Sequence, residues 1–580
     1  MGAFFLVRGS ERSTVSTVTS TARKLFEKQG FEAPKSLVTA HAELLLFPKQ
    51  VAPVANYYDG GENEFCAATG TFIYKGQIGT PALKAFHADF DPARIPLGGM
   101  YGAFCVIVAK AGRLHLFTDR LGVYKVYVDS DRRMFSSSFL GLAGALRRRV
   151  IEPRAVYEYV FQGATYGQAT VLQGIEQADC DQVYHIGKRL TCSGAPRALP
   201  VGFEHGSIDF HLERNLENLR RFYRTIARCF PGGIDTALSG GYDSRLTLAL
   251  LRDQSVSAKV HVYGGQGDAD VRVARNIASG EGFELVHVDK GGWPRPAPAG
   301  FADIVDRNFQ AFDGYPADGI FDPGADLETR RSRCRNGELM LNGGGGEVFR
   351  NFFYLPNRPF LARHLVWAFY SGFDPRTCRT RYFSERDYCG GLSDKIKRVL
   401  GVDNGMLTRP EIELLYPIFR CRYWMGRNNS VNNRLGPALT PFIDHQVVGD
   451  AVKIPLEYKN YGLFEGRMIR ALDPKLASYP SAYGHDFASG PTLGHKLYDL
   501  ATLWRPAPLR RYAYRVQARC KPWRRPFWLE PPYLDAALPD GFPVMNRFFD
   551  MNALRDPTQL ARAATLEYLF QAFNADPPET

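Results

Sequence analysis

The chain has 580 residues, so two or three domains of roughly 100–200 residues each are expected. Hydrophobic residues make up 45% and charged residues 23%, which is typical of globular proteins and excludes a disordered chain. The apolar run at residues 101–109 is about half the length needed to cross a bilayer, and residues 3–7 end at Arg8 without a signal-peptide core. We therefore expect a soluble, cytoplasmic protein with no membrane span.

The charge balance is basic, with 72 Lys and Arg against 60 Asp and Glu and a net charge of +12. A net positive charge favours binding to nucleic acid, to anionic substrates or to membrane surfaces, and it does not distinguish among these partners. Ten cysteines are scattered without a C-x-x-C pair, so a structural zinc site is not expected.

Residues 1 to about 200 read mostly as strands and turns, which predicts an α+β unit with long antiparallel sheet content. The expected strands are 3–7, 43–47, 70–74, 104–109, 113–118 and 124–128, and the expected helices are 140–149 and 153–161.

After Pro200 strands and helices alternate, which predicts parallel strands joined by right-handed crossovers. The expected order is helix 211–230, strand 234–238, helix 243–252, strand 259–263, helix 270–279 and strand 283–288. Beyond about residue 410 the pattern is mostly helical.

The segment 238–245, LSGGYDSR, lies between a predicted strand and a predicted helix, where backbone amides and the helix dipole favour an anion. Gly240 and Gly241 let the backbone approach phosphate oxygens, and Asp243 is suited to hold Mg²⁺ against them. The loop lacks the Gly-Lys-Ser/Thr ending of a Walker A loop. A ligand-free glycine turn is the plain alternative, but Ser239, Asp243 and Ser244 together favour a phosphate site.

This loop resembles the SGGxDS pyrophosphate loop of the asparagine synthetase superfamily. Four further segments resemble that family's motifs in the family's order: 119–127 in the glutaminase domain, 262–264 with Asp270 and His287, 341–349, and 441–444. The resemblance implies an α+β, Ntn-hydrolase-like sandwich at 1–200. It also implies an α/β, Rossmann-like ATP-pyrophosphatase domain at 205–490 and a helical C-terminal extension at 491–580.

The family implies an ATP-dependent, AMP-forming amide ligase that adenylates a carboxylate and couples it to an amine or ammonia, with ATP and Mg²⁺ as cofactors. The residues expected to bind ATP are Leu238, Ser239, Gly240, Gly241, Asp243, Ser244, Val262, Tyr263, Gly264, Asn342, Gly343 and Gly344. Asp243 and Glu347 are the expected metal ligands, and together with His485 they are the candidate catalytic residues. Asp313, Tyr315 and Asp322 are candidates for the carboxylate substrate, with an ordinary polar loop as an equal alternative.

Three positions depart from the family pattern. The chain begins Met1-Gly2-Ala3 without the terminal cysteine of a glutaminase, so we expect no glutamine hydrolysis. Gly346 stands where the family has a metal-binding aspartate, which leaves Glu347 either to reach the metal or simply to pair with Arg350. The family lysine near the end of the synthetase domain is missing, and His485 stands nearest to its place.

Several alternatives stay open at this stage. One is a nucleotide-binding pseudoenzyme that acts as a scaffold, and another is an intramolecular amide cyclase similar to β-lactam synthetases and lasso-peptide cyclases. Nucleic-acid modification is disfavoured by the glutaminase-like first half, so a small-molecule or peptide carboxylate is the expected partner, with a homodimer left open. The basic, aromatic stretch 509–528 suits an anionic partner, but a solvated helix face is favoured there.

Overall fold

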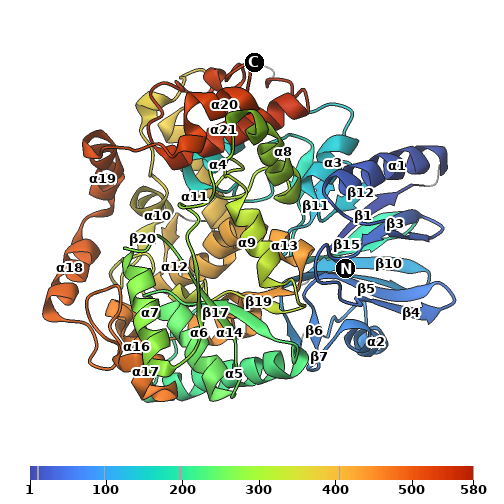
Figure 1. The fold of residues 1–580 in the computed structure, drawn as a ribbon. Helices are drawn as coiled ribbons and strands as arrows, with labels where there is room; N and C mark the ends of the chain where they lie inside the picture. The colour runs from blue at the N-terminus through green and yellow to red at the C-terminus, as the bar shows by residue number, and fades with distance from the viewer. Residues whose placement is uncertain (10–11, 97, 195–198, 404, 579–580) are drawn as a thin grey trace.

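The computed structural model describes residues 1–9, 12–96, 98–194, 199–403 and 405–578. The first part of the chain carries two six-stranded antiparallel sheets, seen on the right of Figure 1. The first sheet has the order β13-β11-β12-β1-β3-β2 and the second β15-β14-β10-β9-β5-β4. Their strands are β1 (Ala3–Arg8), β2 (Lys35–Val38), β3 (Ala42–Phe47), β4 (Tyr57–Gly61), β5 (Glu64–Gly70), β9 (Phe104–Lys110), β10 (Arg113–Thr118), β11 (Tyr127–Asp129), β12 (Met134–Ser136), β13 (Ile175–Gln177), β14 (Gln182–Ile186) and β15 (Leu190–Gly194). The short strands β6 (Ile73–Tyr74), β7 (Gln77–Ile78) and β8 (Met100–Tyr101) form a separate three-stranded sheet.

Helices cover the outer faces of both large sheets. α1 (Arg12–Lys28) lies on the first sheet, where Phe26 stacks on Phe47 of β3 with ring centroids 4.1 Å apart. α2 (Gly79–Asp89) lies on the second sheet, where Phe86 meets Phe117 of β10. The side chains that alternate with these fill the space between the sheets. The layers are therefore helix, sheet, sheet and helix (Figure 1).

The helices α1 and α2 are absent from the sequence-based prediction for this region. In α1 the run of Thr, Ser and Val favours a strand by local preference. Its buried residues nevertheless fall at helical spacing, at Val15, Thr19, Ala22 and Phe26, and the helix packs against α3 (Phe139–Ala145). Tertiary packing thus decides the conformation of this segment.

The middle of the chain forms a five-stranded sheet whose order is β18-β17-β16-β19-β22. Its neighbouring strands are all parallel, as the alternation of strands and helices predicted. The strands are β16 (Ile234–Ala237), β17 (Lys259–Tyr263), β18 (Leu285–Val288), β19 (Leu339–Leu341) and β22 (Ala438–Leu439). The central strand β16 leads directly into the 238–245 loop.

Helices pack against both faces of this sheet. On one face Val260 and Val262 of β17 are buried in a cluster with residues of α6 (Tyr242–Asp253) and α7 (Ala269–Glu281). On the other face Asp235 pairs with His261 and with Arg333 at the end of α9 (Ala325–Arg333). The buried Asp235 carboxylate is therefore satisfied within the sheet layer and forms part of the scaffold.

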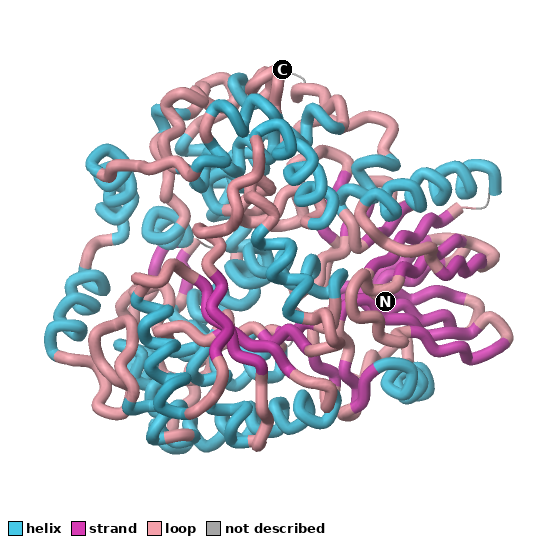
Figure 2. Tube along the Cα trace, viewed as in Figure 1, coloured by secondary structure: helices cyan, strands magenta, loops and turns pink. Residues whose placement is uncertain are grey.

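Helices make up most of the rest of the chain, which Figure 2 shows as cyan tube around the magenta strands of the parallel sheet. They are α4 (Pro153–Gln162), α5 (Ile208–Cys229), α8 (Phe301–Ala311), α10 (Ala362–Phe369), α11 (Glu385–Leu400), α12 (Arg409–Leu415), α13 (Gly426–Leu435), α14 (His445–Ala451), α15 (Leu456–Lys459), α16 (Leu463–Leu472), α17 (Pro474–Ser478), α18 (Leu493–Trp504), α19 (Ala507–Cys520), α20 (Pro531–Ala537) and α21 (Pro557–Ala572). A short hairpin pairs β20 (Phe360–Leu361) with β21 (Met406–Leu407). Among the described residues, no helix combines the length and the apolar character that crossing a membrane requires.

Candidate functional site

The loops that the sequence singled out meet at the carboxyl edge of the parallel sheet. The 238–245 loop follows β16, Gly264 follows β17, Asn342 follows β19, and the 441–444 segment follows β22 closely. In open parallel sheets this edge is the usual place for a ligand, because the connecting loops form a crevice there. The four segments are therefore brought together, although they are far apart in the sequence.

The glycines at 343–346 allow two of these loops to pack without side chains between them. A Cβ atom at Gly343 would lie 3.1 Å from the carbonyl oxygen of Asp243, and one at Gly345 would lie 2.5 Å from Ile443 Cγ2. At Gly346 a Cβ atom would lie 2.7 Å from Asp243 Cγ. The run of glycines thus reflects close packing, and a side chain at position 346 would require the Asp243 and Glu465 side chains to shift.

Protein groups already satisfy the backbone amides of the 239–241 turn. The Ser239 amide donates to Ser244 Oγ at 2.9 Å, and the Gly241 amide donates to Ser239 Oγ at 3.2 Å. The Gly240 amide donates to the Asp270 carboxylate at 2.9 Å, so one anion already occupies this part of the loop. The Ala482 amide in turn donates to the Gly240 carbonyl at 3.0 Å and closes over the turn.

The N-terminus of α6 keeps a feature suited to an anionic ligand. No side chain caps this helix, whose N-cap residue is Gly241. The first-turn amides of an uncapped helix and its dipole both favour a negative group. An anionic group therefore fits the start of α6 better than it fits the turn that precedes it.

The Arg350 guanidinium lies among three carboxylates at the edge of this site. Its Nη2 is 2.5 Å from Asp243 Oδ1, and its Nε is 2.9 Å from Glu465 Oε2. Glu347 is more distant, at 3.7 Å from Nη2, and accepts a hydrogen bond of 2.5 Å from Tyr416. Arg350 therefore neutralises Asp243 and Glu465 directly and Glu347 at longer range.

Burial and mutual repulsion shift the titration of this cluster. Burial, opposed by Arg350 and reinforced by Glu347, raises the pKa of Asp243 to about 7. Burial and the nearby Asp243 carboxylate raise the pKa of Glu465 well above its usual range. Burial also acts on Glu347, but Arg350 and Tyr416 outweigh it and hold the pKa of Glu347 below its usual range. The cluster therefore holds a proton near neutral pH, most readily on Glu465.

In this arrangement the Asp243 and Glu347 carboxylates both face the Arg350 guanidinium, whereas Mg²⁺ takes near-octahedral oxygen ligands. Their role as magnesium ligands therefore stays a prediction, and it requires the guanidinium to move away from them. At position 346, where the family pattern has an aspartate, a side chain would require the Asp243 and Glu465 side chains to shift. The pairing of Glu347 with Arg350 was the plainer of the two interpretations that the sequence offered.

His485 packs over the start of α6 rather than lining the cavity beside it. Its Nε2 is 3.0 Å from the Tyr242 hydroxyl, and Phe487 stacks on the Tyr242 ring at 3.9 Å between centroids. Burial and the neighbouring His495 lower the pKa of His485, so its imidazole is neutral near pH 7. His485 is thus placed to hold Tyr242.

A cavity of about 540 Å³ lies beside the Arg350 cluster. Tyr242, Glu347 and Arg350 form the wall nearest the α6 loop. Phe352, Phe353 and Phe369 form an aromatic wall, and residues of α18 and α19, including Thr502 and Leu503, form another. Its size is in the range of pockets that hold a small-molecule ligand.

The expected adenosine-binding residues lie on β17 and just after β17 and β19, the two strands that flank β16. Val262 is buried in the sheet, and the ring of Tyr263 lies 4.6 Å from Lys290 Nζ. Gly264 has φ of 134°, which favours glycine, and its carbonyl accepts from His287 Nε2 at 2.7 Å. Asn342 Oδ1 accepts from the Gly344 amide at 3.0 Å and so stabilises the glycine loop.

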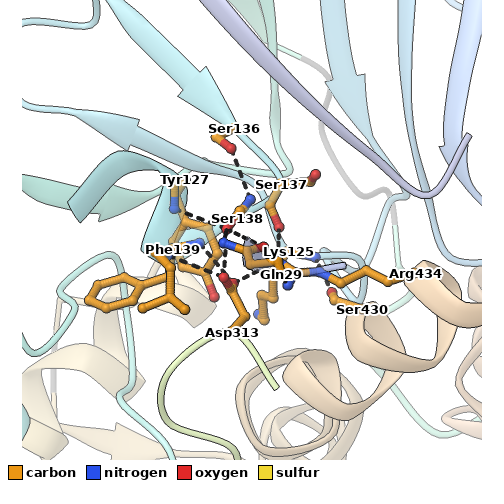
Figure 3. A network of polar contacts seen from close by, with 12 residues as sticks. Gln29, Lys125, Tyr127, Ser136, Ser137, Ser138, Phe139, Asp313, Ser430 and Arg434 are labelled. Carbon is orange, nitrogen blue, oxygen red and sulfur yellow. Dashed lines mark hydrogen bonds and ion pairs between the residues drawn. The ribbon is translucent and has the colours of Figure 1, made fainter. Parts of the chain in front are cut away.

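Asp313 lies in an interior network between the two halves of the chain, as Figure 3 shows. Its carboxylate accepts from Ser138 Oγ at 2.6 Å and from the Phe139 amide at 2.7 Å, and it pairs with Arg434 at 2.9 Å. These partners satisfy the carboxylate at the N-terminus of α3, where the helix dipole favours it. Its role is therefore to join the sandwich to α13.

The other two substrate candidates are also structural. Tyr315 is 1% exposed and lies beneath Arg427, whose guanidinium is 3.7 Å from its ring centroid. Asp322 accepts from the backbone amides of Gly324 and Asp326 and so orders the start of α9. None of the three candidates is among the residues that line the 540 Å³ cavity, so a substrate bound in that cavity would not contact them.

Glu465 is the residue of this site that the sequence did not reveal. It lies on α16, is fully buried, and is the closest partner of the Arg350 Nε atom. A single glutamate in an amphipathic helix carries no local signal that distinguishes it from a solvated one. Only its lack of exposure marks it as a paired charge.

The position that follows Met1 is also closed to a side chain. A Cβ atom at Gly2 would lie 2.9 Å from Lys49 Cα and from the Pro48 carbonyl oxygen. It would also lie 3.0 Å from the Arg434 carbonyl oxygen. A cysteine at this position would need the surrounding backbone to move.

Comparisons with known proteins give little further information. No protein-family model matches the chain, and no curated protein matches it. The solved structures that are similar to part of it include glutamine phosphoribosylpyrophosphate amidotransferase from B. subtilis complexed with ADP and GMP, and a structure described as the allosteric regulatory enzyme of purine biosynthesis. Each shows 10% identity and a TM-score of 0.24 and covers 50% of this chain, which spans 81% and 76% of theirs. Likeness at this level carries no conclusion about the chain.

Proposed function

We propose that the chain is an ATP-dependent, AMP-forming amide ligase, which activates a carboxylate as an acyl-adenylate and transfers the acyl group to an amine. The observation that supports this most is the meeting of the 238–245 loop, the glycine loop and Arg350 at one sheet edge. The uncapped start of α6 suits phosphate oxygens, and the cavity of about 540 Å³ is large enough for an organic acid.

In this proposal the first-turn amides of α6 and the Ser239 hydroxyl hold the β- and γ-phosphates. A substrate carboxylate oxygen attacks the α-phosphorus, and the bond to pyrophosphate breaks. The amine nitrogen then attacks the acyl carbon, and AMP leaves with the bonding electron pair. Arg350 lines the cavity and supplies a planar set of donors that suits carboxylate or phosphate oxygens.

The test is release of pyrophosphate and AMP from ATP in the presence of candidate acids and amines. Turnover should fall at least tenfold in Arg350→Gln, since a charge at the reaction site is removed. The matched control is Arg376→Gln, whose arginine pairs with Asp374 on the surface. Equal turnover in the two variants would remove Arg350 from the chemistry. A cyclase would be recognised by loss of one water from a single substrate.

The second candidate is a nucleotide-binding scaffold without turnover. The Arg350 cluster favours it, because the guanidinium occupies the carboxylates that a catalytic metal would need. ATP binding by calorimetry with no pyrophosphate release against any acid would favour the scaffold. Absence of both binding and release would exclude both candidates.

A further inference from the structure

α18 and α19 carry apolar stripes that face solvent. On α18 the stripe consists of Leu493, Leu497 and Trp504, with Tyr498 beside it, and on α19 it consists of Leu509, Tyr512 and Val516. These side chains are between 41% and 80% exposed. Both helices lie at the outer edge of the molecule, on the left of Figure 1.

This orientation is the reverse of that of an ordinary surface helix. Apolar residues at helical spacing normally face the core, with polar residues outside. Half of the large apolar side chains that are exposed among the described residues lie within 493–516. Scattered exposed leucines are normal, but a concentration on two consecutive helices marks an interaction surface.

Polar contacts between α19 and the body of the protein hold this helix in that orientation. Arg510 donates to the carbonyl oxygens of Phe353 at 3.2 Å and Tyr354 at 2.6 Å. Arg515 pairs with Glu385 at 2.5 Å. The arginine side of α19 is thus attached to the body of the protein, so its apolar side is left outward.

The segment is also strongly basic. Residues 491–528 contain nine Lys and Arg against one acidic residue, Asp499. Asp499 is buried, whereas Arg505, Lys521, Arg524 and Arg525 are exposed. The surface therefore combines exposed Leu, Trp and Tyr with an uncompensated positive charge.

We propose that α18 and α19 form a docking surface for an anionic lipid bilayer. Leucine and tryptophan side chains on an interfacial helix enter the boundary between head groups and acyl chains, where tyrosine and tryptophan are favoured. Lysine and arginine nearby attract anionic head groups. A polyanion such as nucleic acid would satisfy the charge and leave the leucines and valine exposed, so the bilayer accounts for both features of the surface.

The same helices form one wall of the cavity beside Arg350. A molecule docked through α18 and α19 therefore holds that cavity next to the bilayer surface. The docking itself does not depend on the proposed ligase activity.

The experiment is co-sedimentation of the full chain with vesicles of phosphatidylcholine alone or with about one third phosphatidylglycerol. Binding to the anionic vesicles is expected, with weakening at high salt. Leu497→Asp and Leu509→Asp should each weaken binding by roughly tenfold or more, since each removes the burial of a leucine. Neutralising Lys521, Arg524 and Arg525 to Gln should cost about fivefold per residue.

The controls are Val38→Asp and Val201→Asp, which change exposed valines elsewhere on the surface and should bind as the parent does. Tryptophan fluorescence should be quenched by brominated acyl chains in the parent and less in Trp504→Phe. Absence of vesicle binding at low salt would overturn the proposal. It would also be overturned by equal binding of the Leu497 and Val38 variants, or by a dimer in solution that the Leu497 and Leu509 changes dissociate.

Discussion

Replacing Arg350 with methionine should strongly destabilise the protein. Glu465 is fully buried, the Asp243 side chain is 17% exposed, and Arg350 is the cation within 3 Å of each. Removing one partner of a buried ion pair leaves an uncompensated charge, which costs about 3–5 kcal/mol. Methionine preserves most of the arginine stem, so the loss arises from charge rather than from packing.

The loss of unfolding free energy caused by Arg350→Met should be smaller at low pH than at high pH. Burial raises the pKa of Asp243 to about 7 from an ordinary value of about 4. An acid whose pKa is raised by folding contributes stability that is present below its unfolded pKa and lost as pH rises through the folded pKa. Without Arg350 the pKa of this carboxyl should rise further, so Arg350→Met should be less destabilising at pH 5 than at pH 8.

The assay is urea unfolding followed by intrinsic fluorescence at both pH values. The matched control is Arg376→Met, which breaks an ion pair of the same 2.5 Å length. Because Arg376 is exposed, its change should cost less than about 1 kcal/mol. Adding Glu465→Gln to Arg350→Met should recover part of the loss. If the two arginine variants unfold alike, or if Glu465→Gln recovers nothing, the view of a charge-balanced cluster is wrong.

Three further predictions concern positions that the sequence singled out. Gly346→Asp should cost about 1–3 kcal/mol from overpacking against Asp243 and should gain no Mg²⁺-dependent stability, as urea unfolding with and without MgCl₂ would show. Asp313→Asn should cost about 3 kcal/mol by leaving Arg434 unpaired and should leave ATP affinity unchanged, as unfolding and calorimetry would show. The chain should hydrolyse no glutamine, and Gly2→Cys should not create this activity, because that position has no room for a Cβ atom; glutamate release above buffer would contradict this.

The parallel sheet was predictable because its signals are local. β17 has the predicted bounds, and the bounds of β16, α6 and α7 differ from the predicted ones by at most two residues at either end. Alternation of short apolar runs with amphipathic segments suffices for such a unit. The first half of residues 12–28 is rich in Thr and Val, which hides the helix from local preference, whereas its packing on the first sheet follows the helical spacing of its buried residues.

The candidate site was predictable only in part. The turn between β16 and α6 was predictable, because Gly240 and Gly241 stand between an apolar run and an amphipathic segment. The sequence suggested a substrate role for Asp313 because a polar loop near the sheet edge resembles a binding loop. The structure instead places its carboxylate in a buried network. Its partner Arg434 lies on a distant helix, and no spacing rule connects the two. Glu465 and Arg350 are paired in the same non-local way.

The features that distinguish this site from the family pattern, Gly346 and the Arg350 cluster, are physically coupled. A side chain at Gly346 would overlap Asp243 and Glu465, and an aspartate there would add a fourth carboxylate to three that share one guanidinium. Glu465 can be buried only because Arg350 and a bound proton balance it. Removing Arg350 alone leaves Glu465 unpaired, and adding an aspartate alone creates a clash and a further charge. A metal ion between Asp243 and Glu347 would therefore have to displace the Arg350 guanidinium, and an aspartate at position 346 alone should not create a tighter metal site.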